Sequence, residues 1–337
     1  MNEPTARNRE IIVTTLPEGS LTQDHFEMRA GAMPIAGEGE AVIRTILMSI
    51  DAANRAWMQG ATYREPILAG DAMHTFSIGE VVTSNDARLS PGMIVAAEGR
   101  WADHAVIKAR HAQIIGDHRP LSHHLSVLGI AGKTAYHGLV DVGRPLAGET
   151  VLVSAAAGSV GMYVGQIAKA LGCHVVGIAG GARKCAWVVE ELGFDACVDH
   201  RAPGFFKAVR AVCPKGVDVY FDNVGGKILE TALFIMNEKG RIVCCGAVSQ
   251  YDNAAPSGPR NLPGMVVVKR LRMEGFIVMD FADQAADVEA KLSQWVNEGA
   301  IRVVDDIVDG LENAPAALIG LLAGENRGKR MVQVSPE

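Results

Sequence analysis

The stretch VLVSAAAGSVG, residues 151–161, decides the fold of this chain. Its first five residues are apolar or small, which is typical of a buried parallel strand. Gly158 and Gly161 then form a glycine turn, and apolar residues at helical spacing follow it. A strand, a tight turn and a helix N-terminus together present backbone N–H groups and a helix dipole to a pyrophosphate. The stretch therefore indicates a dinucleotide cofactor and redox chemistry.

The glycine pattern departs from the usual fingerprint at one position. Dinucleotide-binding turns read G-x-G-x-x-G, whereas Ala156 stands here in the place of the first glycine. Taken alone, the pattern is equally compatible with an ordinary strand–helix turn of any α/β protein. The rhythm of the neighbouring segments favours the dinucleotide interpretation.

Strand-like runs alternate with helical stretches after about residue 126. The alternation predicts an α/β fold with a doubly wound parallel sheet over residues 126–302. We expect the strands of this domain at residues 151–155, 174–179, 196–199, 217–221, 241–246 and 272–278. An amphipathic helix is expected over residues 284–298.

Residues 1–125 have a different rhythm, with short β-branched or alternating runs punctuated by Gly and Pro. These runs follow each other too closely for βαβ units, so they predict a compact β-rich domain. Strands are expected at residues 40–47, 75–83, 93–97 and 104–107, with a turn at Ser90-Pro91-Gly92. Residues 303–337 are mixed in pattern, and we expect them to complete the first domain.

Composition bounds the class of protein. The chain has 337 residues, enough for two domains, and its formal net charge of -6 gives no electrostatic case for nucleic acid or an anionic membrane. Residues 1–20 lack the apolar core of a signal peptide, and there is no apolar run of about 18 residues. The six cysteines form no C-x-x-C pair, so buried reduced thiols are expected. These features predict a cytoplasmic protein.

A group of histidines raises the alternative of a metal site. His111, His118, His123 and His124 lie close together in the sequence. No cysteine or carboxylate at suitable spacing completes a ligand set. We therefore expect a solvated loop there, and no metal.

The end of the second predicted strand distinguishes NADPH from NADH. NAD-binding folds place an acidic residue there to bind the ribose hydroxyls, but this strand ends in Gly180, Gly181, Ala182, Arg183 and Lys184. A carboxylate would repel a 2′-phosphate, whereas Arg or Lys pairs with it. The residues favour NADPH. The alternative is that both cations are solvated charges in a first helical turn.

Several longer stretches together resemble one family. They are AAAGSVGMYVGQIAKALGCHVVGIAGGARKC, LGFDACVDH, CPKGVDVYFDNVGG, CGAVSQYD, DGLENAP and GLLAGENRGK, with weaker matches in SIDAANRAWM and GKTAYHGL. The chain is similar to the zinc-independent medium-chain dehydrogenase/reductases, in the branch of the leukotriene B4 12-hydroxydehydrogenases and prostaglandin reductases. The resemblance implies a GroES-like β domain with substrate contacts joined to a Rossmann domain. It also implies NADPH-dependent reduction of a carbon–carbon double bond conjugated to a carbonyl, in a homodimer.

The resemblance also implies cofactor contacts at the turns and strand ends. Lys184 would contact the 2′-phosphate, and His200 replaces a family tyrosine on the same side, which alters that contact. Together with Gly180 and Arg183, the expected cofactor residues are Gly158, Val160, Gly161, Lys184, His200, Asn223, Cys245, Gly246, Val248, Phe276, Ile277, Val278 and Asn326.

Zinc-dependent relatives polarise an oxygen with a metal held by cysteine and histidine. Their G-H-E segment is here at best Gly70-Asp71-Ala72, so a zinc-independent reaction is expected. Hydride transfer to the β-carbon of an enone builds an enolate, which needs a hydrogen-bond donor near its oxygen and a proton for the α-carbon. Tyr251, where the family has a tyrosine, is the candidate donor, assisted by the cofactor ribose. The alternative is that Tyr251 only packs beside the cofactor.

The residues expected to line the substrate pocket differ from the family pattern. The pattern D-P-Y-M-R-G-R-M appears here as DAANRAWM, residues 51–58, so Ala53 and Asn54 are expected to reshape the pocket. Arg55 matches a family arginine, for which a structural ion pair is favoured over chemistry. Tyr63 matches a position at the substrate cleft, although a surface-loop role is equally compatible. Lys133 replaces an apolar residue, and we favour a solvent-facing cation over a contact with an anionic substrate.

Other activities share the same nicotinamide site. An NADP-dependent alcohol or ketone dehydrogenase, a quinone reductase and a non-catalytic NADPH-binding sensor or structural protein are all compatible with the glycine turn. Retention of both Tyr251 and Tyr63 is not required of a sensor, which favours an enzyme acting on a small conjugated carbonyl compound.

Overall fold

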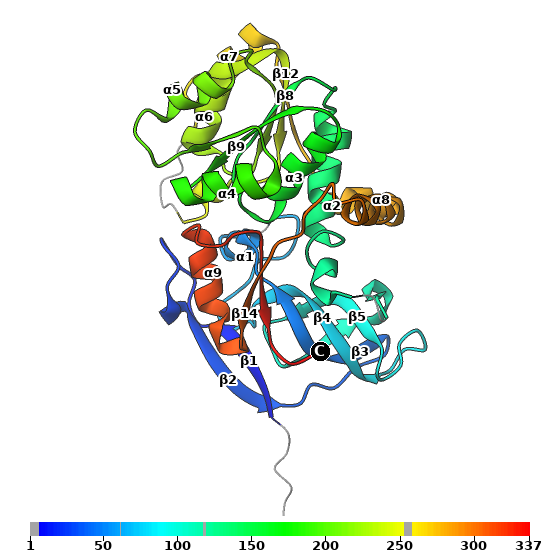
Figure 1. Ribbon diagram of the computed structural model, residues 1–337. Helices are drawn as coiled ribbons and strands as arrows, with labels where there is room; N and C mark the ends of the chain where they lie inside the picture. The colour runs from blue at the N-terminus through cyan, green and yellow to red at the C-terminus, as the bar shows by residue number, and fades with distance from the viewer. Residues whose placement is uncertain (1–6, 61, 117–118, 253–257) are drawn as a thin grey trace, which may run out of the picture. The chain divides into compact units, whose positions relative to one another are not determined.

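The computed structural model describes residues 7–60, 62–116, 119–252 and 258–337. The chain divides into two compact units (Figure 1). The first unit comprises residues 1–125, 305–325 and 330–337, and the second comprises residues 126–304 and 326–329. The short stretch 326–329, which the sequence pattern assigns to the first domain, therefore packs within the second unit.

The second unit contains a six-stranded sheet in the order β10-β9-β8-β11-β12-β13. Every pairing in it is parallel. The strands are β8 (Thr150–Val153), β9 (His174–Ala179), β10 (Ala196–Asp199), β11 (Val217–Asp222), β12 (Met236–Cys244) and β13 (Arg272–Gly275). Numbered within the unit, this is the 3-2-1-4-5-6 order of a Rossmann domain, which confirms the predicted fold class.

Helices cover both faces of this sheet because successive strand residues point to opposite sides. Val151 and Val153 of β8 pack into one cluster, whereas Leu152 between them packs into the other. The first cluster includes residues of α2 (Ile130–Tyr136), α3 (Ser159–Ala170), α4 (Ala182–Leu192) and α8 (Ala285–Asn297). The second includes residues of α5 (Phe205–Val212), α6 (Gly226–Ile235) and α7 (Leu262–Lys269). Short π- and 3₁₀-helical turns lie at His137–Gly143, Val248–Gln250 and Val278–Gln284.

Strand ends differ from the predicted bounds where the backbone leaves the sheet. β8 ends at Val153, before Ser154, because Ala155 has a φ of 50° and turns the chain toward α3. β13 ends at Gly275, and a 3₁₀ turn begins at Val278, so the predicted strand over residues 272–278 is shorter than expected.

The first unit contains a seven-stranded sheet and a two-stranded one among the described residues. The larger sheet has the order β14-β15-β3-β4-β5-β7, with β6 paired to β3, and the smaller joins β1 to β2. The strands are β1 (Arg7–Val13), β2 (Phe26–Ala32), β3 (Glu40–Ser49), β4 (His74–Ser84), β5 (Ile94–Arg100), β6 (His104–Lys108), β7 (Gln113–Ile114), β14 (Asp305–Asp309) and β15 (Lys329–Gln333). The four predicted strands are confirmed, and the Met93 N–H donates to Ser90 across the predicted turn.

Short helices accompany these sheets. They are α1 (Ala52–Trp57), α9 (Ala314–Leu322) and 3₁₀ turns at Gln23–His25, Ala109–His111, Leu121–His124 and Leu311–Asn313. The solvated histidine loop is only partly correct, because His124 is buried although His111 is exposed. His118 lies outside the described residues.

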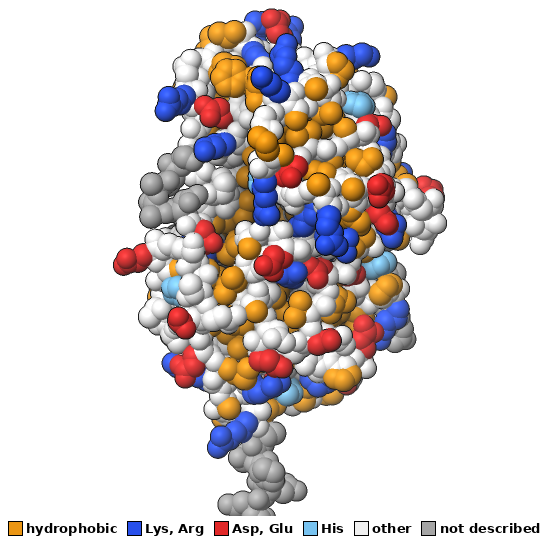
Figure 2. Space-filling model, turned by 60° about the vertical axis from the view of Figure 1, so that its left-hand side comes forward, with side chains coloured by type: hydrophobic (Ala, Val, Ile, Leu, Met, Phe, Trp, Pro, Cys, Tyr) orange, Lys and Arg blue, Asp and Glu red, His pale blue; other side chains and the backbone are white. Residues whose placement is uncertain are grey.

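The surface and the thiols agree with the composition. All six cysteines are free, and each is buried or half-buried. Lys and Arg side chains are interspersed with Asp and Glu over the face that Figure 2 shows. Within the described residues, none of the helices is both long and apolar enough to cross a membrane.

Candidate functional site

The glycine turn joins β8 to α3 by close backbone packing. The Gly158 N–H donates to Ala155 O at 2.9 Å, and the first helical bond runs from Met162 N to Gly158 O at 3.1 Å. The amides of residues 159–161 therefore lie in the first helical turn, where N–H groups have no intrahelical acceptor. A Cβ at Gly161 would lie 2.3 Å from Ala155 O, so only glycine allows this approach. This is the arrangement of backbone N–H groups that the sequence predicts as a pyrophosphate site.

The structure explains why alanine is tolerated in place of the first glycine. Ala156 is fully buried, and its N–H donates to Ile178 O at 2.9 Å. A Cβ built on Gly177 of β9 would lie 2.9 Å from the Ala156 methyl. The methyl group fits because the neighbouring strand carries a glycine at the facing position.

The segment 326–328 lies against this turn. The Gly328 N–H donates to Ala157 O at 2.9 Å, and Gly158 forms a parallel bridge with Gly328. Asn326 is buried, its amide donates to Gly328 O, and its own carbonyl accepts a hydrogen bond from the Lys184 ammonium. The structure therefore brings the predicted Asn326 and Lys184 together beside the glycine turn.

The predicted adenosine contacts lie just after β9, in the first turn of α4, and at the end of β10. Gly181 has a φ of 94°, which favours glycine, and α4 begins at Ala182. Arg183 is exposed, whereas Lys184 is half-buried. His200, at the end of the neighbouring strand β10, lies close to Gly180, since a Cβ there would be 3.1 Å from its Nε2. Desolvation and the adjacent Arg201 guanidinium lower the pKa of His200.

Hydrogen bonds join the carboxyl ends of β8, β11 and β12. The Asn223 N–H donates to Ser154 Oγ at 2.8 Å, and the Asn223 amide donates to Ser154 O at 2.8 Å. The N–H groups of Cys245 and Gly246 both donate to Asp222 O, at 2.9 and 3.1 Å. The predicted nicotinamide residues at these strand ends therefore share one hydrogen-bonded network.

Asp222 is the centre of this network, and sequence reasoning missed it. Its Oδ1 accepts hydrogen bonds from Tyr220 Oη at 2.7 Å, Gly225 N at 2.8 Å and Val224 N at 3.0 Å. Burial raises the pKa of Asp222, although these hydrogen bonds act in the opposite direction. The signal in the sequence was an aspartate directly after a buried strand.

We expect Asp222→Ala to lower the free energy of unfolding by about 3 kcal/mol, because the buried Tyr220 hydroxyl and two N–H groups would lose their acceptor. Tyr220→Phe removes a single hydrogen bond and is expected to cost about 1 kcal/mol. Urea denaturation of both variants measures the difference. Equal losses would contradict a central role for the carboxylate.

Cys245 and its neighbours line the end of β12. Cys245 is half-buried, and desolvation followed by the Asp222 charge raises its pKa to about 12. The group is a neutral thiol at neutral pH and not a nucleophile. The Val248 N–H donates to Asn223 O at 3.2 Å, which ties the next turn to the same network.

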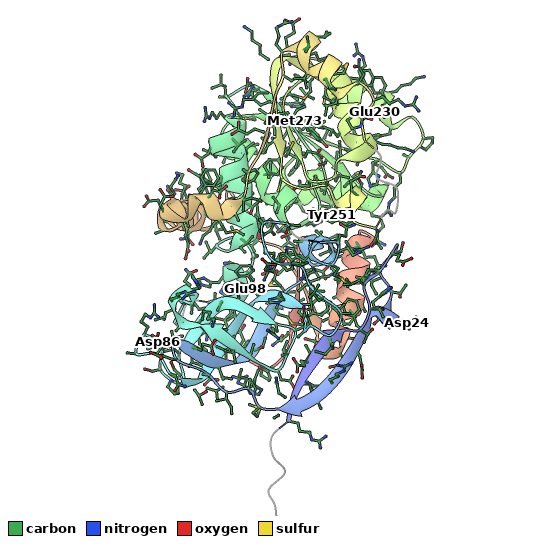
Figure 3. All side chains as sticks on the ribbon, turned by 180° about the vertical axis from the view of Figure 1, so that it is seen from behind. Asp24, Asp86, Glu98, Glu230, Tyr251 and Met273 are labelled. Carbon is green, nitrogen blue, oxygen red and sulfur yellow. The ribbon has the colours of Figure 1, made fainter. Side chains whose placement is uncertain are left out.

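Tyr251 lies at the end of this turn, in the second unit (Figure 3). Its phenol oxygen accepts a hydrogen bond from the Ala247 N–H at 3.4 Å and would lie 3.6 Å from a Cβ on Gly246. A phenol can both accept and donate a hydrogen bond. The geometry places this phenol close to the end of β12.

The segment Phe276, Ile277 and Val278 follows β13 and is half-buried. The Phe276 ring packs edge-on against Phe221, with ring centroids 6.4 Å apart. A Cβ at Gly138 would lie 2.5 Å from Phe276 Cζ, so a glycine is needed behind this ring.

In the first unit, the residues of α1 have mainly structural roles. Asn54 is buried, its Oδ1 accepts from Asp51 N at 2.9 Å, and its amide donates to His74 O at 2.8 Å. Both ends of the amide bind backbone groups, which gives Asn54 a structural role in this turn. Arg55 is also buried and donates to Gly19 O at 2.9 Å, which agrees with a structural role. Ala53 packs against the core of this unit.

Tyr63 is followed by Arg64, whose side chain makes three contacts. About half of Tyr63 is exposed, at 51%. The Arg64 guanidinium lies 4.3 Å from the centre of the Trp57 ring, forms an ion pair with Glu98 and donates to His74 Nδ1 at 3.2 Å. The tryptophan that replaces a family arginine thus carries a cation–π contact, which anchors the loop next to Tyr63.

The favoured interpretation of Lys133 was wrong. Its ammonium forms an ion pair with Glu289 of α8 at 2.9 Å, and only 15% of its side chain is exposed. Lys133 is therefore neither a solvated cation nor an isolated charge for an anionic substrate. Over the described ranges, we find no cluster of three or more His, Cys, Asp or Glu side chains that would hold a metal ion.

Known proteins match nearly the whole length of the chain. A family model described as zinc-binding dehydrogenase matches residues 159–298, and one described as the N-terminal domain of oxidoreductase matches residues 9–115. NADPH-dependent curcumin reductase of Escherichia coli (strain K12) is 40% identical, covering 99% of both chains. The NADP(+)-dependent 2-alkenal reductase of Nicotiana tabacum is 34% identical, covering 98% of both. The structure of CurA from Vibrio vulnificus in complex with NADPH is 38% identical, with a TM-score of 0.93, and the match covers 98% of this chain and all of that one.

Proposed function

The chain belongs to the medium-chain dehydrogenase/reductase family, and we propose that it uses NADPH to reduce the carbon–carbon double bond of an α,β-unsaturated ketone or aldehyde. The observation that carries this proposal is the convergence of the glycine turn, the Asn223 network and Tyr251 at the carboxyl ends of β8, β11 and β12. Ligands of open α/β sheets bind outside these strand ends. The names of two relatives, an NADPH-dependent curcumin reductase and an alkenal reductase, support the same chemistry.

The residues present fit NADPH. The first turn of α3 offers N–H groups, Gly161 keeps the turn close to β8, and Lys184 and Arg183 supply cations beyond β9. Bound there, NADPH supplies the hydride. Asn223, Cys245, Gly246, Val248 and residues 276–278 are proposed to hold and orient the nicotinamide end.

Tyr251 is the proposed catalytic residue. Reduction at the β-carbon leaves negative charge on the carbonyl oxygen of the substrate as an enolate. A phenol keeps its proton at neutral pH. It can therefore donate a hydrogen bond to that oxygen without a prior proton transfer. The α-carbon then takes a proton from a hydroxyl group or water. Tyr63 and Ala53, on the first unit, are proposed substrate contacts.

Absorbance of NADPH at 340 nm, followed with a panel of enones, enals, quinones, ketones and alcohols, tests the proposal. We expect oxidation of NADPH with the enones and enals and saturated carbonyl products by mass spectrometry. Turnover confined to alcohols with NADP⁺, or to quinones, would replace this function by a dehydrogenase or a quinone reductase. NADPH binding without turnover of any substrate would favour a sensor.

We further propose a homodimer that forms through β13. This strand is the edge of the parallel sheet, and all four of its residues are exposed. Pairing with a second copy in antiparallel register about Met273 would place Arg272 opposite the partner's Glu274 twice. Val267 and Val268 of α7, the helix that precedes β13 in the chain, are also exposed and add apolar surface.

We expect Glu274→Arg to shift the protein toward monomer, because two like-charged pairs would face each other across the edge. The charge-swapped double variant Arg272→Glu with Glu274→Arg restores opposite charges and is expected to restore the dimer. Light scattering coupled to size-exclusion chromatography measures the mass. A dimer unaffected by the single variant would place the interface elsewhere.

The free cysteines bear on the compartment in which the protein acts. Six free cysteines, none in a C-x-x-C pair, suit a reducing compartment. We propose that the chain acts in the cytoplasm on a small conjugated carbonyl compound.

A further inference from the structure

Two basic side chains cover Gly180, the first residue after β9. A Cβ built there would lie 3.0 Å from Arg201 Nε, 3.1 Å from Arg201 Cζ and 3.1 Å from His200 Nε2. Unlike Gly181, Gly180 does not have a positive φ. The guanidinium and imidazole groups therefore lie directly over this glycine, and they, not its backbone conformation, limit the space for a side chain there.

Arg201 reaches this position from a different strand. It follows β10, and its N–H donates to Asp199 Oδ1 at 2.9 Å. The same oxygen accepts the Gly181 N–H at 2.8 Å. One carboxylate thus ties the loop after β10 to the loop after β9. The hydrogen bonds from these two N–H groups stabilise the charged carboxylate and lower the pKa of Asp199.

The position over Gly180 is where the second strand of a Rossmann domain meets the adenosine ribose. NAD-binding members carry an acidic side chain at this point, whereas this chain has a bare glycine with a guanidinium over it. Arginine presents several N–H donors in a planar fork that matches a phosphate, while lysine offers a point charge. The ammonium of Lys184 additionally binds the Asn326 carbonyl.

We infer that Arg201 is a specificity-determining residue of this chain, whose guanidinium binds the 2′-phosphate of NADPH and distinguishes it from NADH. Arg201 lies outside the glycine turn and outside the loop after β9. These are the two segments in which the sequence pattern by itself predicts cofactor contacts. His200 lines the same side, and Lys184 approaches from α4. The 2′-phosphate is thereby bound by side chains from two neighbouring strand ends.

Binding of cofactor fragments tests this inference independently of any reductase activity. We expect Arg201→Gln to weaken binding of NADPH and of 2′,5′-ADP by about 10- to 100-fold, the usual effect of losing a charged hydrogen-bond donor. Binding of NADH and of 5′-AMP should change by less than about twofold, since neither carries the 2′-phosphate. Calorimetry measures 2′,5′-ADP and 5′-AMP, and nucleotide fluorescence measures NADPH and NADH.

Two further variants control the experiment. Arg201→Lys keeps the positive charge but loses the planar set of guanidinium N–H donors, so we expect an intermediate loss of affinity for NADPH. Arg210→Gln removes an exposed cation of α5 that lies outside the proposed site, and it should leave both cofactors unaffected. Circular dichroism verifies that all variants are folded.

Three results would overturn the inference. They are an unchanged NADPH-to-NADH preference in Arg201→Gln, an equal weakening of NADPH and NADH binding, and an effect no larger than that of Arg210→Gln. The proposed reduction of enones can fail while the fragment data hold, and the reverse is equally observable, so the two proposals are separable.

Discussion

Tyr251→Phe is expected to lower kcat for an enone by about 100-fold, the effect of removing one donor to a developing oxyanion. The substitution removes only the hydroxyl, whose oxygen lies 3.4 Å from Ala247 N, and the ring remains in place. Affinity for NADPH should be preserved, because the glycine turn and the loop after β9 are untouched. Stopped-flow measurement of single-turnover NADPH oxidation reads the chemical step directly.

Tyr63→Phe is the matched comparison, since it removes a phenol hydroxyl from the other proposed site residue. Because Tyr63 is half exposed and its loop is held by Arg64, we expect a higher KM for the substrate with kcat within about threefold. If Tyr251→Phe retained full kcat, the hydrogen-bond donor to the enolate oxygen would have to be another group or water. If both variants changed only KM, both tyrosines would be binding residues.

Gly161→Ala is expected to abolish measurable NADPH binding and to lower the free energy of unfolding by about 3 kcal/mol, at the upper end of overpacking effects. The added Cβ would lie 2.3 Å from Ala155 O and 2.8 Å from its carbonyl carbon, both of them backbone atoms. The helix N-terminus must then move away from β8, which disrupts the cradle of N–H groups. Thermal unfolding with and without NADPH measures both effects.

Ala156→Gly provides the control at the other end of the same turn. It restores the usual G-x-G-x-x-G pattern and removes one buried methyl group, so we expect a loss of about 1 kcal/mol and unchanged NADPH binding. A strong loss of binding in Ala156→Gly, or normal binding in Gly161→Ala, would contradict the assigned roles of the two positions.

Much of the Rossmann unit could be predicted because its signals are local. β9 and β10 have the predicted bounds, since each is a short apolar run bordered by turn residues. The missing acid after β9 and the cations at Arg183 and Lys184 were visible in one short stretch of sequence, and they favoured NADPH. The boundaries of β8 and β13 were less accurate, because a left-handed Ala155 and a 3₁₀ turn at Val278 depend on packing that periodicity does not report.

The remaining site residues could not be predicted because they depend on contacts distant in sequence. Lys133 meets Glu289 after a separation of 156 residues, which no local pattern reveals. Asn54 was predicted to lie in the pocket wall, yet its side-chain amide forms hydrogen bonds with the backbone of Asp51 and His74. Asp222 stood in a quoted motif, but its role follows only from four groups that converge on one buried oxygen.

The sequence by itself determined the Rossmann architecture, the dinucleotide turn and the preference for NADPH, because strand periodicity, glycine spacing and the charge of one loop are properties of consecutive residues. Only the tertiary structure decided why Ala156 is tolerated, since the room for its methyl comes from Gly177 on another strand. It also decided which side chains cover Gly180, since Arg201 and His200 arrive there from the end of β10. Parallel strands bring distant segments to one edge of a sheet, and the chemistry gathered at that edge is not written in any single stretch of the chain.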